Sequence, residues 1–209
     1  LIDGLLEDQA EVVALDDEAA LLRYAYRVAG TVGLLMCHVL DCHAPVARAH
    51  AIDLGIAMQL TNIARDVLED AGMTRRYIPG DWVGGATPAD ILSAAKAPGS
   101  GVHTDITAAV TRLLDMAEAF YASGAQGYRY LPWRAHLSIA VAARVYRQIG
   151  VQLRAADCAW HDGRQVTGKV TKLRCSVVAL ASLGSRFGAA ERRHDQRLHL
   201  ALRGLPYVV

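Results

Sequence analysis

The sequence lacks the charge imbalance and the long apolar runs that mark nucleic-acid-binding and membrane-spanning proteins. Its 209 residues carry 22 Lys and Arg against 21 Asp and Glu, a formal net charge of +1. Because no dense basic run stands out, we expect no nucleic-acid partner. No stretch of about eighteen apolar residues is free of charge, so no segment should span a bilayer. The nearest, residues 168–188, carries Lys169, Lys172 and Arg174 and leaves open a helix resting on a membrane surface.

Cysteine is scarce and widely spaced. The chain has no close cysteine pairs of a zinc ribbon and not the density of a secreted disulfide scaffold; the four residues are Cys37, Cys42, Cys158 and Cys175. No secretory leader pattern is present, so we expect buried thiols in a reducing cytoplasm. The opening LIDGLLEDQ resembles the interior of a helix without a start signal, and we therefore expect the chain to be a fragment.

Alternating strand patterns are missing too, whereas helical periodicity runs through most of the chain. With 53% hydrophobic residues, the sequence predicts one all-α domain over residues 1–209 with a substantial core. Caps, prolines and glycines place the expected helices at residues 16–40, 45–71, a short one from 88, 103–121, 132–156 and 169–186. The tail, residues 188–209, is charged and then apolar and receives no assignment.

One expected helix carries a row of oxygen donors. In QLTNIARDVLEDAGMTRRYIP, residues 59–79, the side chains of Asn62, Asp66 and Asp70 are four residues apart and share one helix face. Mg²⁺ would relieve the repulsion between the carboxylates, because it takes hard oxygen ligands from one or two carboxylates plus substrate phosphates. A solvated face with salt bridges, such as Arg65 with Glu69, is the plainer alternative.

Arginines surround this acidic face. Arg65 lies within it, and Arg75 and Arg76 follow in a loop rich in glycine and proline. Because the planar guanidinium fork grips phosphate oxygens at two points, the combination favours a metal-bridged diphosphate over a merely solvated surface.

A second informative segment is YAYRVAGTVG, residues 24–33. Gly30 and Gly33 fall inside an expected helix, where each costs about 1 kcal/mol relative to alanine. Close helix packing would compensate for this cost, and so would room for a ligand beside the small side chains. Tyr24 and Arg27 lie one turn away.

Together these segments resemble the squalene and phytoene synthases. YAYRVAGTVG is similar to that family's Y-x-x-x-V-A-G-x-V-G signature, and residues 59–79 are similar to its second aspartate-rich signature with the following Arg-x-Tyr-x-Pro at Arg75, Tyr77 and Pro79. AARVYRQIGVQL, residues 142–153, and the segment after Trp160 resemble later family helices. The similarity runs to about Leu180 and is most like bacterial phytoene synthases.

The resemblance implies an isoprenoid synthase helical bundle and a prenyl transfer. Two geranylgeranyl diphosphates would condense head to head to phytoene, a carotenoid precursor, through prephytoene diphosphate, with Mg²⁺ or Mn²⁺ and without NADPH. A squalene or presqualene diphosphate synthase that uses farnesyl diphosphate is the alternative. A non-catalytic relative acting as an assembly factor, or a plain helical interaction domain, belongs to another class.

The resemblance also implies roles for individual residues. The metal positions are Asn62, Asp66, Glu69 and Asp70. The substrate-binding positions are Arg27, Val28, Ala29, Gly33, Gln59, Arg65, Arg75 and Tyr77. The catalytic positions are Asp66, Asp70, Tyr24 near the reacting carbons and Tyr146 at the cavity wall. The expected partners are prenyl diphosphates, with peripheral contact to the inner face of the membrane for product release.

The family's first aspartate-rich motif, D-x-x-x-D on a facing helix, is not found in these 209 residues. Asp3 and Glu7 have the spacing, but their stretch matches a later family segment. The resemblance therefore implies a bundle without its N-terminal helices. The missing wall would come from an N-terminal part of the same protein or from a separate polypeptide, unless the chain is a degenerate remnant.

Overall fold

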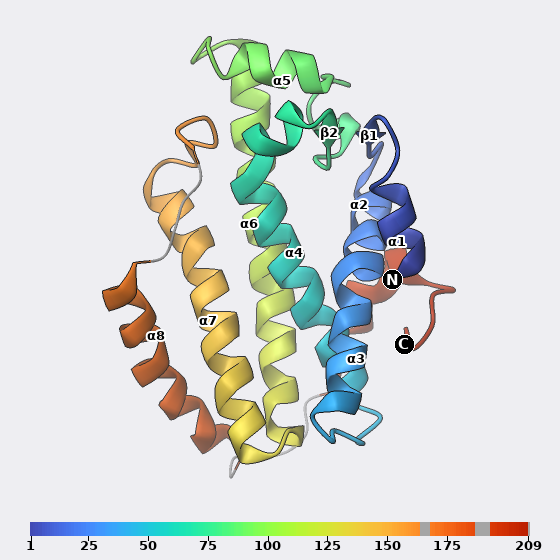
Figure 1. The fold of residues 1–209 in the computed structure, drawn as a ribbon, viewed down its shortest axis with the longest axis vertical. Coiled ribbons are helices and arrows are strands. Elements are labelled where there is room, and N and C mark those ends of the chain that lie inside the picture. Colours follow the sequence, from blue (N-terminus) through green and yellow to red (C-terminus); the bar gives the residue numbers. More distant parts are fainter. Residues whose placement is uncertain (164–167, 187–192, 209) are drawn as a thin grey trace.

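The computed structural model describes residues 1–163, 168–186 and 193–208, and it confirms the all-α prediction. Long helices run side by side along one axis, and short elements cover their ends (Figure 1). The α-helices are α1 Ile2–Glu7, α2 Glu18–Ala25, α3 Thr31–Val39, α4 Ala47–Gly72, α5 Pro88–Ala94, α6 Gly101–Gln126, α7 Trp133–Ala155 and α8 Lys169–Ala181.

Polar caps start several of these helices where the sequence predicts a start. The Asp17 side chain accepts a hydrogen bond from the Ala20 amide at the beginning of α2. Thr87 and Asp90 form a reciprocal capping box at α5, with Pro88 in the first turn. Each such cap satisfies amides that have no partner inside the helix.

Helix α4 is the centre of the bundle. It packs along α6 and also contacts α3 and α7, as Figure 1 shows. Its fully buried apolar residues include Ile52, Ile56 and Leu60, which meet Ile106 and Leu113 of α6 in one core. Burial of each such side chain contributes about 1.5–3 kcal/mol, so this core fixes the direction in which the opposite face of α4 points.

The expected helix over residues 16–40 is broken by a π-helical turn. Tyr26–Gly30 separates α2 from α3 and inserts one wide turn where a regular helix was predicted. Such a turn shifts the side chains that follow it relative to a continuous helix, and it is common at functional sites. Helical periodicity over a window does not resolve a single widened turn, which is why the sequence missed it.

A short parallel ladder was also not expected. Val13–Ala14 (β1) pairs with Arg75–Arg76 (β2), joining the chain before α2 to the loop after α4. The buried Arg76 side chain donates to the carbonyls of Leu15 and Ile78. These contacts hold the arginine-containing loop against the end of α4.

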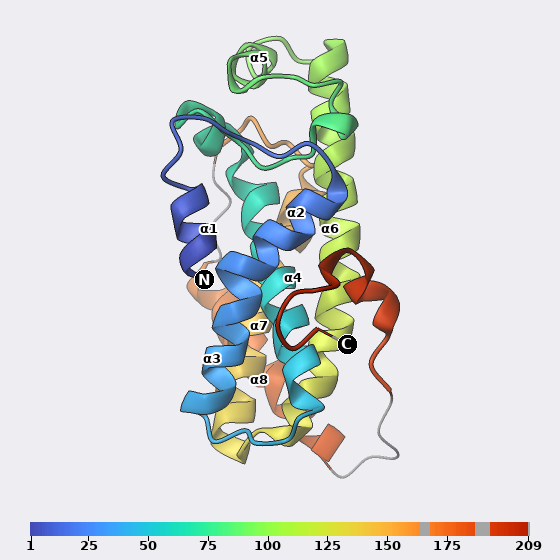
Figure 2. The same ribbon diagram turned by 90° about the vertical axis from the view of Figure 1, so that its right-hand side faces the viewer.

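The C-terminal part folds back onto the bundle. The 3₁₀ turn Gln196–Leu202 packs on α2, with Leu202 fully buried, and Figure 2 shows this segment along the side of the bundle. The expected helix over 169–186 is confirmed as α8 followed by the 3₁₀ turn Ser182–Arg186. Residues 164–167, 187–192 and 209, which include part of the family-like segment after Trp160 and part of the unassigned tail, lie outside the described residues. Within the described part of the chain, no helix is long and apolar enough to cross a membrane.

Candidate functional site

The acidic face of α4 forms as the spacing predicts. Asn62, Asp66 and Asp70 follow one another by a turn each on this continuous helix. Arg65 pairs with its neighbour Asp66, with Nε 2.7 Å from Oδ1 and Nη2 2.5 Å from Oδ2, rather than with the exposed Glu69. The carboxylate raises the pKa of the Arg65 guanidinium, so this side chain stays charged.

Two observations on this face favour a cation-binding site. The Asn62 Oδ1 atom is buried and has no hydrogen-bond partner among the described residues. Burial, followed by the negative charge of Asp66, raises the pKa of Asp70 to about 7, while Arg75 opposes the shift. A divalent ion would satisfy the orphaned amide oxygen and relieve the repulsion between the carboxylates, and an oxygen-only donor set suits Mg²⁺ or Mn²⁺.

A second polar group lies at the loop side of this face and is centred on Asp8. The Tyr24 hydroxyl donates to Asp8 Oδ1 at 2.9 Å, and the Tyr77 hydroxyl donates to the same oxygen at 2.7 Å. The two rings stack with centroids 4.7 Å apart, and Arg75 Nη2 donates to the Asp8 carbonyl at 2.9 Å. Burial raises the pKa of Tyr24 strongly and that of Tyr77 to about 12, so both hydroxyls remain protonated donors.

Sequence reasoning did not identify Asp8. Its partners lie 16 and 69 residues away in the chain, so no local spacing marks it. The charge of Asp8 is also among those that raise the pKa of Asp70, so the Asp8 group interacts electrostatically with the acidic face of α4. In the sequence, Asp8 lies within LIDGLLEDQ, which resembles the interior of a helix, and an acidic residue in such a stretch is common.

An apolar cavity of about 380 Å³ lies beside the acidic face of α4. It brings together six of the predicted site residues, and most of its remaining walls are aliphatic. The six are Val28, Ala29, Gly33, Gln59, Asn62 and Tyr146. Because Asn62 belongs both to the acidic face and to the cavity wall, the polar site and the apolar space are continuous.

The glycines of this region allow close helix contact. A Cβ on Gly33 would clash with the carbonyl oxygen of Ala51, and a Cβ on Gly55 would clash with that of Ala29. The backbones of the π-turn and α3 therefore touch that of α4, which is the packing explanation for the glycine cost. Gly33 also lines the cavity, so both explanations considered for it apply.

Arg27 lies apart from this cavity. Its Nη1 atom forms an ion pair with Glu7 of α1 at 2.9 Å, and Arg27 is not among the residues that line the cavity. The structure thus places it at the contact between α1 and the π-turn.

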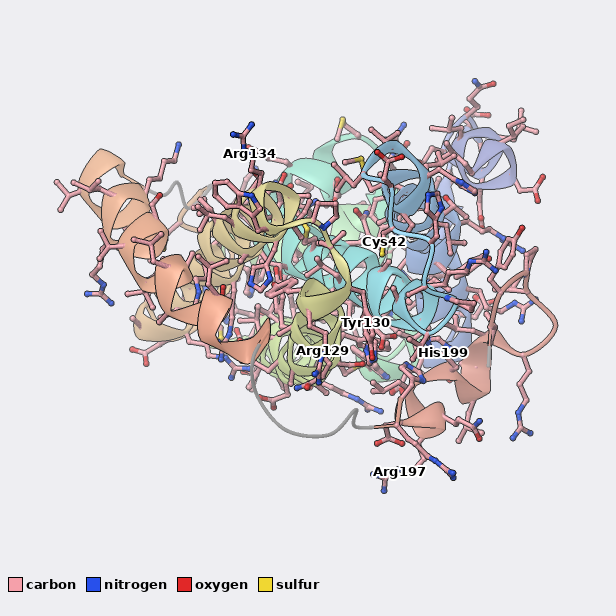
Figure 3. The ribbon with its side chains drawn as sticks, turned by 90° about the horizontal axis from the view of Figure 1, so that it is seen from below. Cys42, Arg129, Tyr130, Arg134, Arg197 and His199 are labelled. Carbon is pink, nitrogen blue, oxygen red and sulfur yellow. The ribbon has the colours of Figure 1, made fainter. Side chains whose placement is uncertain are left out.

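The cavity wall also includes Cys42, which follows α3. The Cys42 thiol donates to the Tyr130 carbonyl at 3.6 Å, and both residues are labelled in the view from below (Figure 3).

Known proteins are similar to this chain in sequence and in fold. Residues 1–174 match the squalene/phytoene synthase family. The chain is 37% identical over 182 residues to a phytoene synthase of Pseudescherichia vulneris, covering 85% of this chain and 56% of that protein. It is 39% identical over 175 residues to a 15-cis-phytoene synthase of a Paracoccus species, covering 83% and 54%. The chain thus spans little more than half the length of these relatives.

Solved structures agree on the architecture. A dehydrosqualene synthase in complex with ligand superposes with a TM-score of 0.69 and 25% sequence identity, covering 88% of this chain and 64% of that one. A squalene synthase from Alicyclobacillus acidocaldarius gives a TM-score of 0.62 at 18% identity, covering 75% and 60%, which supports the fold alone. The isoprenoid synthase bundle predicted from the sequence is therefore confirmed, and the chain belongs to the squalene/phytoene synthase family.

Proposed function

We propose that this chain supplies the diphosphate-binding wall and the prenyl cavity of a phytoene synthase. The complete protein would join two geranylgeranyl diphosphates head to head and form phytoene through prephytoene diphosphate. The observation that carries the proposal is the continuity, through Asn62, between an oxygen-donor face and an apolar cavity. A prenyl diphosphate has the same two parts, a charged head and a long apolar tail.

Asn62, Asp66 and Asp70 would hold Mg²⁺ or Mn²⁺, with Glu69 exposed beside them. A divalent ion bound there neutralises the charge that develops on the departing diphosphate. Arg65 and Arg75 would grip phosphate oxygens, and Gln59 lines the cavity wall. Because the Arg65 guanidinium already donates to Asp66, it would have to donate to Asp66 and to the substrate phosphate at the same time.

The cavity protects the allylic cation that ionisation leaves. Its aliphatic walls exclude water, which would otherwise quench the cation before the second prenyl chain attacks it. The Tyr146 ring in the wall offers an aromatic face to a passing positive charge. Tyr24 and Tyr77, whose hydroxyls donate to Asp8, would lie beside the diphosphate end.

The family's first acidic motif is part of this proposal. We propose that residues outside these 209 supply it, either in the same protein or in a separate polypeptide. They would face α4 across the cavity and hold further metal against the diphosphate. The aspartates of α4 would then act as one of two acidic walls.

Product analysis tests the function. The protein expressed with its upstream coding sequence is incubated with Mg²⁺ and either geranylgeranyl or farnesyl diphosphate, with and without NADPH. We expect phytoene from geranylgeranyl diphosphate in the absence of NADPH. A C30 product alone would overturn the phytoene assignment in favour of a squalene-type synthase, and no product from either substrate would favour a non-catalytic assembly factor.

We further propose that α8 rests on the membrane surface and aids product release. Its exposed residues Val170, Leu173 and Val177 recur at helical spacing, while Cys175 and Ala179 face α7. Lys172 and the neighbouring basic residues would contact anionic headgroups. The helix lies on the outer side of α7 in Figure 1.

Vesicle sedimentation tests this contact. We expect the protein to bind vesicles with anionic lipid and to lose most binding in a Leu173→Ser, Val177→Ser variant. Substitution of Leu200, exposed on the C-terminal segment, by serine is the matched control and should bind like the parent. Equal binding by the α8 variant would contradict the proposal.

A further inference from the structure

A second cluster of ligand-type side chains lies away from the diphosphate face. Asp53 of α4 is fully buried, and its two carboxylate oxygens meet histidines from the C-terminal segment. His194 Nε2 is 2.7 Å from Oδ2, and His199 Nε2 is 2.8 Å from Oδ1. Ser123 of α6 donates to Oδ2 at 2.5 Å. In Figure 3, His199 lies against the bundle while Arg197 points away from it.

Within the described residues, the buried Asp53 carboxylate has no lysine or arginine partner. Its two oxygens are instead contacted by the two histidines and Ser123. The ion pairs of Asp53 within the described residues are with these two histidines. Nearby His50 is bonded to Ser123, with Nδ1 and Oγ 3.2 Å apart.

The donor set indicates which cation this cluster would bind. One ligand atom from each of Asp53, His194 and His199 lies within 4.8 Å of the others. Two imidazole nitrogens with one carboxylate oxygen suit Zn²⁺, whereas Mg²⁺ prefers oxygen ligands alone. In a tetrahedral zinc site, neighbouring ligand atoms are about 3.3 Å apart, and the 4.8 Å limit on the present separations leaves only a small side-chain adjustment to reach that geometry.

We propose that Asp53, His194 and His199 bind one Zn²⁺ ion, with a fourth position left for water. The ion takes the place of the Nε2 protons, and each histidine then carries its proton on Nδ1. It joins the C-terminal segment to the centre of α4. Asp66 lies thirteen residues further along α4, about 20 Å along the helix axis, so the zinc site is separate from the diphosphate face.

The surroundings also set the expected affinity. The Nδ1 atoms of His194 and His199 are buried and have no hydrogen-bond partner among the described residues. Zinc-binding histidines usually donate this second nitrogen to an acceptor, and loss of such a partner weakens metal binding by about 10–100-fold. We therefore expect tighter binding than at scattered surface histidines and weaker binding than in a zinc finger.

Zinc titration of the metal-free 209-residue chain tests the proposal. With a chromophoric chelator as competitor, we expect one equivalent of Zn²⁺ to bind, and Co²⁺ in its place to show the visible absorption of a tetrahedral ion. His199→Gln should weaken zinc binding about tenfold or more. The matched control is His161→Gln, which alters another histidine pair, His103 with His161, that lies beside Asp162.

Folding is checked independently. His194→Gln removes a ligand at a slightly exposed position, and circular dichroism reports whether the helices persist. Asp66→Ala should keep the zinc affinity of the parent, because that residue belongs to the diphosphate face. If the parent binds no zinc, or if folded His194→Gln and His199→Gln bind it as well as the parent does, the cluster is only a hydrogen-bonded clasp and the proposal is wrong.

Discussion

At the scale of single residues, the acidic face of α4 holds two groups that destabilise the free protein. Asn62 keeps a buried acceptor without a partner, and Asp70 is held where its charged form is disfavoured. Each feature is costly in the free protein and is relieved by a cation, so both indicate a prepared ligand site.

Asp66 is the residue whose loss should affect turnover most directly. In the protein with its upstream sequence, we expect Asp66→Ala to lower the rate of product formation about 10²–10³-fold, because one charge-stabilising contact at the diphosphate is lost. Helical content should not change. Asp105→Ala, at an exposed position of α6, is the control and should retain the parent rate.

Asp70 predicts a pH dependence of stability in the metal-free protein. Its folded pKa of about 7 lies above the ordinary aspartate value of 3.8, so the folded state holds a proton that the unfolded state has released. Stability should therefore fall as the pH rises from about 4 to 7. Asp70→Asn should flatten this fall in urea unfolding, whereas Glu69→Gln at the exposed neighbouring position should leave it in place. An unchanged slope in Asp70→Asn would show that the carboxyl is ionised throughout.

At the scale of elements, periodicity and caps identified nearly every helix, and two local features escaped them. The π-turn Tyr26–Gly30 is a single widened turn that helical periodicity does not resolve, and the β1–β2 ladder depends on partners distant in the chain. The ladder matters for the site because it fixes the loop with Arg75 and Tyr77, and the π-turn carries Val28 and Ala29 into the cavity wall.

The close contact between α3, the π-turn and α4 gives a prediction about Gly55. A methyl group there meets the Ala29 backbone, which cannot move aside as a side chain can. We expect Gly55→Ala to lower the free energy of unfolding by about 1–3 kcal/mol through overpacking. Gly72→Ala, at the open end of the same helix, has nothing within 4 Å of the added methyl group and should leave stability unchanged or slightly raised. Urea unfolding of the two variants compares them directly.

At the scale of the whole molecule, the C-terminal segment closes one side of the bundle. Tyr26 donates to the Pro206 carbonyl at 2.6 Å, and Arg23 donates to the Ala201 carbonyl at 3.2 Å. Through Asp53 and Tyr26, the segment contacts both α4 and the π-turn. This tail receives no assignment from its sequence, because its short 3₁₀ turn has no amphipathic period of its own.

Leu202 anchors that closure. It is fully buried, whereas Leu200 in the same turn is 52% exposed. We expect Leu202→Ala to lower the free energy of unfolding by about 2–5 kcal/mol and Leu200→Ala to change it by less than about 0.5 kcal/mol. Equal effects in urea unfolding would mean that the segment does not pack on the core in solution.

The sequence by itself determined the helices, the family and the shared helix face of Asn62, Asp66 and Asp70. These depend on local periodicity, on caps and on the four-residue spacing of Asn62, Asp66 and Asp70, all of which are properties of one stretch of chain. Only the tertiary structure decided the rest: Asp8 as the common acceptor of Tyr24 and Tyr77, Arg65 with Asp66, and Asp53 with His194 and His199. The long-range contacts of Asp8 and Asp53 arise when packing brings distant segments together. The pairing of Arg65 with Asp66 depends on the side-chain rotamers in the folded protein. Sequence spacing encodes neither the long-range contacts nor these rotamers.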